Sequence, residues 1–184
     1  MKFIAGFIAA LVVLAVGGLI YIYSGTYNVA ASKSDSKIIR WVMETAREKS
    51  IEARADKVGP QPPPSPDSIK EGFEHFDGMC VACHGAPGIE RGEVGKGLNP
   101  KPPDLSRLSK EADPRELFWV VKNGIRMTGM PSFGATHNDR AVWNIVAFLK
   151  ELPATTAEKY QEMRKELAAS RGSDHEHEHE HGNQ

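Results

Sequence analysis

The pentapeptide Cys80-Val81-Ala82-Cys83-His84 constrains this chain more than any other stretch. It contains the only two cysteines among 184 residues, and a histidine directly follows the second one. The C-x-x-C-H pattern is the attachment signature of a c-type haem, whose porphyrin forms thioethers with both thiols. The adjacent histidine then binds the iron as its proximal ligand. We therefore expect a domain that folds around one covalently attached haem.

A disulfide and a zinc half-site are the competing interpretations of these residues. A zinc ribbon needs a second C-x-x-C pair, which the sequence lacks. A thioredoxin-like redox site needs a βαβ pattern around the cysteines, and the flanking sequence does not show one. Lys and Arg total 23 and Asp and Glu total 24, so there is no strong basic field for nucleic acid. The missing zinc and thioredoxin patterns favour haem, and the nearly neutral charge argues against a nucleic-acid partner.

A second candidate ligand lies in a glycine- and proline-rich loop downstream. Residues 123–134 read NGIRMTGMPSFG and contain two methionines, Met127 and Met130. We favour Met130 as the sixth ligand, because Gly129 and Pro131 on either side permit a tight approach to the iron. Met127 then packs or is exposed at the rim of the haem.

The segment that follows the motif is also rich in breakers of regular structure. Residues 85–103 contain five glycines and four prolines, a composition that predicts an irregular loop along the haem edge. Pro87 is placed to offer its carbonyl oxygen to the His84 ring. Such a hydrogen bond would fix the orientation of the imidazole.

Three helices are predicted around this site, and each begins at a residue that favours helix N-termini. The capping residues are Ser65, Asp113 and Asn138. Gly72 and Phe76 lie on one face of the first helix, where the glycine leaves a notch beside the ring. The pattern predicts a small all-α domain over residues 67–152.

The N-terminal segment from Phe3 to Tyr23 is apolar and uncharged. Its length matches a hydrocarbon core about 30 Å thick, and tyrosines gather at its far end, as is usual at an interface. A cleaved signal peptide is the alternative, with 29–31 (Val-Ala-Ala) as its cleavage site, but the apolar run is longer than usual for a signal. We predict an uncleaved anchor over residues 1–24. Haem attachment outside the bacterial inner membrane then places the haem domain in the periplasm.

Residues 25–66 are predicted to form a stalk. A charged helix over 34–57 starts at Asp35 or Ser34 and stops at Gly59-Pro60. Its apolar stripe would lie on a partner subunit, at the headgroup surface or in solvent. The stripe comprises Ile39, Val42, Met43, Ala46 and Ala53, with Trp41 beside it. Five prolines between 59 and 66 predict a semi-rigid spacer that holds the next domain away from the membrane.

The C-terminal part is predicted to be a charged helix over 153–171 and a disordered tail over 172–184. In the tail, histidines alternate with acidic residues, at His175, His177, His179 and His181. Imidazoles in a flexible tract bind divalent metals weakly without a preformed site. An engineered tag is the other interpretation of this tail.

Residues 67–152 resemble the class I cytochromes c, of the kind attached to bacterial oxidases and dehydrogenases. The resemblance rests on the CVACHG opening, the GMPSFG loop and a pair of crossing terminal helices. In that family a Gly-x-x-x-Phe on the first helix packs against apolar residues of the last. Gly72 and Phe76 match the first half of this contact, and Ile145 and Phe148 match the second. The resemblance implies one haem c and supports Met130 as the distal ligand.

An iron bound by both His84 and Met130 has no open position, which favours electron transfer over catalysis. We therefore expect a membrane-tethered electron carrier rather than an enzyme. Its partners would be a terminal oxidase, a quinol-oxidising complex or a dehydrogenase. A haem subunit of a peroxidase or nitrite-converting enzyme is one alternative, but it needs a displaceable sixth ligand. A metal-responsive haem protein that senses through the histidine-rich tail is the other.

Overall fold

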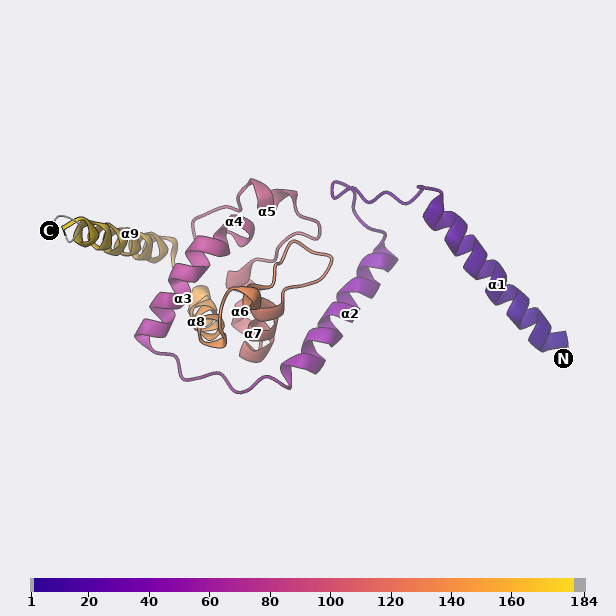
Figure 1. Ribbon diagram of the computed structural model, residues 1–184, viewed down its shortest axis with the longest axis horizontal. Coiled ribbons are helices and arrows are strands. Elements are labelled where there is room, and N and C mark those ends of the chain that lie inside the picture. The colour runs from indigo at the N-terminus through magenta and orange to yellow at the C-terminus, as the bar shows by residue number, and fades with distance from the viewer. Residues whose placement is uncertain (1, 181–184) are drawn as a thin grey trace. The chain divides into compact units, whose positions relative to one another are not determined.

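The computed structural model describes the backbone of residues 2–180 and the side chains of residues 2–171. Its regular elements are helical throughout the described range, which confirms the predicted all-α class (Figure 1). The chain divides into two units, Met1–Asp35 and Ser36–Gln184.

The first unit consists of helix α1 (Lys2–Tyr23) and the segment that follows it. By length and composition, α1 is able to cross a membrane, and the structure buries none of its residues. A signal sequence near the N-terminus has the same properties, so the predicted anchor stays a prediction.

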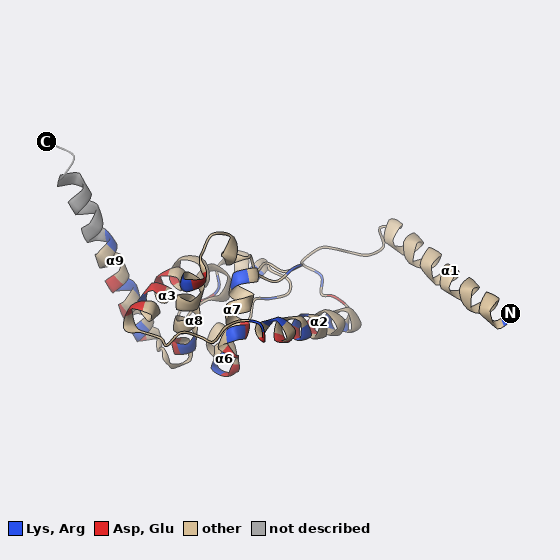
Figure 2. Ribbon diagram, turned by 60° about the horizontal axis from the view of Figure 1, so that its bottom comes forward, with Lys and Arg blue, Asp and Glu red and all other residues tan. Residues whose placement is uncertain are grey.

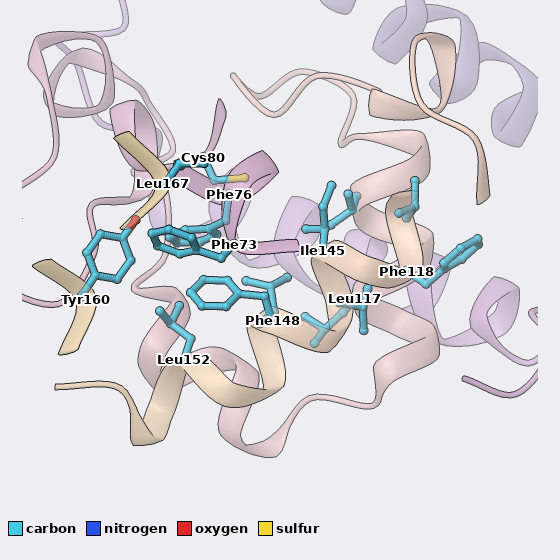
Figure 3. Packing of buried hydrophobic residues seen from close by; sticks show 14 residues of the cluster. Phe73, Phe76, Cys80, Leu117, Phe118, Ile145, Phe148, Leu152, Tyr160 and Leu167 are labelled. Atoms are coloured by element: carbon cyan, nitrogen blue, oxygen red, sulfur yellow. The ribbon is translucent and has the colours of Figure 1, made fainter. Parts of the chain in front are cut away.

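The second unit is organised around the crossing of α3 (Pro66–Met79) and α8 (Asp139–Glu151). Gly72 lies at the crossing, where a Cβ atom would overlap the backbone carbonyl of Asn144. The rings of Phe76 and Phe148 pack with their centroids 5.2 Å apart (Figure 3). The glycine thus lets the two backbones approach, and the phenylalanines fill the space beside them. This is the contact that the family resemblance implied.

Helix α7 (Pro114–Asn123) completes the other side of the core. Asp113 caps it by accepting a hydrogen bond of 2.7 Å from the backbone N–H of Arg115. Phe118 of α7 stacks on Trp143 of α8 at a centroid distance of 4.3 Å. The short helix α6 (Leu105–Glu111), which the sequence reading missed, is tied to α8 because the Lys150 ammonium donates to the carbonyl oxygens of Ser109 and Ala112.

Helix α2 (Lys37–Ala55) lies beside α7 rather than apart from the helical domain (Figure 1). Ala55 is buried, and the Arg54 guanidinium lies 6.0 Å from the centre of the Trp119 ring. The helix is capped by Ser36, not by Asp35 or Ser34, because the Ser36 hydroxyl accepts a hydrogen bond from the N–H of Ile39. The proline-rich segment after α2 therefore connects two helices of one unit. The expectation that this segment holds the domain away from the membrane stays a prediction.

Helix α9 (Ala157–Glu180) packs its first turns against α3. Tyr160 is fully buried, and its ring contacts Phe73 at a centroid distance of 5.3 Å. The helix continues past residue 171, where the sequence reading ended it, because no proline interrupts the backbone there. The predicted disordered tail therefore begins too early, and its last residues, 181–184, lie outside the described residues.

Candidate functional site

The cysteine motif occupies a tight helical turn at the end of α3. Cys80 ends α3 and begins α4 (Val81–His84), and its carbonyl oxygen accepts hydrogen bonds from the N–H groups of Cys83 and His84. No disulfide joins Cys80 and Cys83. Burial raises the pKa of the Cys80 thiol to about 12.

The His84 ring is oriented by a residue that the sequence reading did not single out. Its Nδ1 atom lies 2.9 Å from the carbonyl oxygen of Pro103, and a carbonyl only accepts, so Nδ1 carries the proton. Nε2 is then the nitrogen with a free lone pair, as in metal-binding histidines. The expected role of Pro87 is wrong, because the loop folds so that Pro103, not Pro87, reaches the ring. Burial lowers the pKa of His84, which favours the neutral imidazole that binds metals.

Close backbone contacts hold the segment after the motif against α4. The N–H of Gly92 donates to the carbonyl oxygen of Ala82 at 3.0 Å. A Cβ on Gly95 would overlap the backbone of Cys83. Gly95 belongs to the short helix α5 (Glu93–Gly97), so residues 85–103 are not wholly irregular as predicted. The glycines of this segment therefore let its backbone pack closely against α4 as well as turn.

A cavity of about 440 Å³ lies beside His84. Arg91 contributes to its lining, and the Nε atom of Arg91 is buried with no hydrogen-bond partner in the described part of the chain. The Arg91 charge also acts to lower the pKa of His84, after the larger effect of burial. A buried, unpaired donor of this kind suits an acidic group of a bound molecule. No sequence pattern singled out Arg91, which reads as one cation in a glycine-rich segment.

The loop after α7 presents Met130 in a braced conformation. Gly124 ends α7 with a positive φ of 66°, and a Cβ there would overlap the backbone of Met130 and Pro131. The Met130 N–H donates to the hydroxyl of Thr128 at 3.1 Å, and that hydroxyl donates to the Ile125 carbonyl at 2.8 Å. Met130 is partly buried against the hydrophobic core.

Met127 has a different environment from Met130. Its side chain is 78 % exposed, and its backbone has a φ of 60°. A methionine in solvent cannot shield and bind an iron at the edge of the core. The structure thus favours Met130 over Met127, and binding of the iron by Met130 remains a prediction.

The residues at this site fit a haem. They supply two thiols, a neutral imidazole with a free Nε2 and a thioether beside an aromatic core, the donor types that hold haem in proteins. Figure 3 shows Cys80 at the edge of that core, next to Phe76. A haem propionate would in addition supply the acceptor that the Arg91 Nε lacks.

Comparison with known families supports this interpretation. Residues 67–149 match the family described as cytochrome C oxidase, cbb3-type, subunit III. The match begins in α3, contains both the cysteine motif and the Met130 loop, and ends in α8. A search of curated proteins found no match.

Proposed function

We propose that this chain, whose residues 67–149 form a class I cytochrome c domain, carries single electrons between proteins at the outer surface of a bacterial inner membrane. The domain implies haem binding and haem-based electron transfer. Attachment of one haem c, the membrane anchor, the periplasmic location and the partners are our proposals.

Each residue of the site has a separate task in this proposal. Cys80 and Cys83 would hold the haem through thioether bonds, and His84 and Met130 would bind its iron. The bound haem supplies an iron that alternates between the ferrous and ferric states. The carbonyl of Pro103 keeps the His84 ring oriented, and the loop hydrogen bonds keep Met130 at the core. The buried aromatic residues exclude water from this side of the site.

The braced position of Met130 is the observation that carries the proposal. A sixth ligand fixed by its own loop leaves no place for a substrate at the iron. The alternative of a peroxidase or nitrite-converting subunit needs that place, so the geometry favours outer-sphere electron transfer. A carrier and an electron-transferring subunit of an oxidase share this chemistry.

The membrane and partner assignments rest on other features. The length and apolar composition of α1 support an anchor, and cytochrome c maturation outside the membrane supports a periplasmic haem domain. The matching family is described as an oxidase subunit, which supports a terminal oxidase as the electron acceptor. A quinol-oxidising complex or a dehydrogenase would be the donor.

Purification from membranes tests the proposal. We expect haem that stays with the chain in denaturing electrophoresis, retention in membranes after alkaline carbonate washing, and copurification of a respiratory complex in mild detergent. The purified protein should exchange electrons rapidly with that complex and should not bind nitrite or carbon monoxide at the iron. Ligand binding together with turnover of peroxide or nitrite would overturn the carrier function.

A further inference from the structure

The first half of α2 carries large apolar side chains that the fold leaves exposed. We call this surface the α2 patch. Its residues, with their exposed fractions, are Ile38 (74 %), Trp41 (66 %), Val42 (46 %), Met43 (46 %) and Ile39 (37 %). Five such side chains within six consecutive positions are more than the scattered apolar residues of an ordinary surface.

The centre of the α2 patch, at Val42, points away from the side of α2 that packs toward α7, and Trp41 and Met43 flank it. Val42 and Ile51 are nine residues apart, and at about 100° per residue their side chains point in opposite directions. Ile51 is partly buried and Ala55 is buried, because this side of α2 packs toward α7. The packing that buries one side of the helix therefore cannot cover the other.

We propose that the α2 patch lies in the membrane interface, with its apolar side chains inserted between lipid headgroups. The proposal rests on the membrane anchor proposed above. Only residues 24–36 separate α1 from α2, so an anchored α1 keeps the patch close to the membrane surface.

One side chain of the patch suits a lipid interface in particular. Lys37 and Arg40 lie about 140° and 160° around the helix from Val42, so they do not belong to the patch. Trp41 is the side chain most typical of the interface, because its ring is apolar and its N–H is polar. Figure 2 shows charged residues of both signs along α2.

This contact would orient the haem domain as well as tether it. The second half of α2 packs against α7, and α7 leads through Gly124 into the loop that holds Met130. If α2 is held in the headgroup layer, the haem domain that packs against it keeps one orientation relative to the membrane. Partner proteins would then meet the haem edge in a fixed orientation rather than on a freely rotating domain.

Fluorescence quenching in lipid vesicles tests the proposal. The full-length haem-loaded protein is reconstituted into phosphatidylcholine and phosphatidylglycerol vesicles whose acyl chains are brominated near the headgroup. We expect quenching of tryptophan emission that is mostly lost in Trp41→Phe, because Trp119 and Trp143 lie in the haem domain. Val42→Asn should reduce the quenching, and Val94→Asn, the same change at a valine that is 65 % exposed on α5, should leave it intact.

The quenching and extraction results separate the α2 contact from the α1 anchor. Quenching that persists unchanged in Trp41→Phe, or that is absent in the wild type, overturns the membrane contact and leaves a protein partner as the occupant of the patch. Carbonate extraction of the same vesicles reports separately on α1. A protein that resists extraction but shows no quenching of Trp41 retains its anchor and lacks only the α2 contact.

Discussion

The phenolic oxygen of Tyr160 donates a hydrogen bond of 2.9 Å to Oδ1 of Asp77, which joins helix α9 to helix α3. Arg164 adds an ion pair to the same carboxylate at 3.1 Å. Burial, and then the Asp77 carboxylate, raise the pKa of Tyr160, so its hydroxyl stays a donor at neutral pH. A helix that lies beyond the matched residues 67–149 therefore completes the core of the haem domain.

Loss of this hydrogen bond should destabilise the domain measurably. We expect Tyr160→Phe to lower the free energy of unfolding by about 1 kcal/mol, because the buried ring remains and Arg164 still pairs with Asp77. Guanidinium denaturation followed by haem absorbance measures the change. Tyr27→Phe is the matched control, since the Tyr27 hydroxyl bonds Asp35 at an exposed position outside the haem domain. Equal effects of the two substitutions would contradict a structural role of α9.

An added side chain at the crossing of α3 and α8 should destabilise the domain. Gly72→Ala places a methyl group on the backbone carbonyl of Asn144, so α3 and α8 must separate. We expect a loss of about 1–3 kcal/mol in the free energy of unfolding, as for other overpacked cores. Gly78→Ala is the control on the same helix, where a Cβ meets no neighbour. That variant should be about 0.5–1 kcal/mol more stable than the wild type, because alanine is the better helix former.

Local signals in the sequence predicted local structure well. Helix caps at Ser65, Asp113 and Asn138 are confirmed because their side chains accept hydrogen bonds from the following turn. The four-residue spacing of Gly72 and Phe76 placed both on one face of α3, and the family resemblance implied that this face packs against α8.

Long-range pairings could not be predicted in the same way. Pro103, which lies 19 positions after His84, reaches its ring, and no local pattern encodes where the intervening segment returns. The packing of α2 on α7 and of Tyr160 on α3 likewise depends on which surfaces meet. Periodicity identifies an apolar face but not its partner, so it did not predict that α2 packs on α7 or that α9 packs on α3.

Replacing each of the two loop methionines in turn should identify which of them binds the iron. Met130→Ala should remove the weak red absorption band of a methionine-bound ferric haem and lower the reduction potential, because methionine favours the ferrous state. Met127→Ala, at the exposed position, should preserve both properties. Visible spectra and potentiometric titration of the two variants provide the measurements. Retention of the band in Met130→Ala would identify another sixth ligand.

A histidine pair should make the domain sensitive to acid. His75 of α3 packs edge to face on His137, with centroids 4.9 Å apart. Burial and the neighbouring His137 lower the pKa of His75, while Glu74 and Glu71 oppose this shift. The unfolded chain therefore takes up a proton near pH 6.5 while the folded chain does not, so stability falls as the pH drops below that value.

His75→Gln should therefore flatten the decline of the unfolding free energy between pH 6.5 and the lower folded-state pKa of His75. Denaturant titrations at a series of pH values measure the slope. His175→Gln, in the tail, serves as the matched control and should keep the wild-type decline. If the slope is unchanged in His75→Gln, another group causes the acid sensitivity.

The partly buried Arg91 side chain should raise the reduction potential of the haem. Its Nε atom has no hydrogen-bond partner among the described residues, and its charge already acts on the neighbouring His84. A fixed cation near the iron disfavours the more positive ferric state.

Arg91→Gln should lower the potential by the order of tens of millivolts, given that a tenfold change in a one-electron equilibrium is about 59 mV. Arg91→Lys should lower it less, because the charge remains while the matching donor is lost. Arg107→Gln, an exposed arginine on α6, should leave the potential unchanged. Equal potentials for Arg91→Gln and the wild type in a potentiometric titration would show that this charge is screened from the iron.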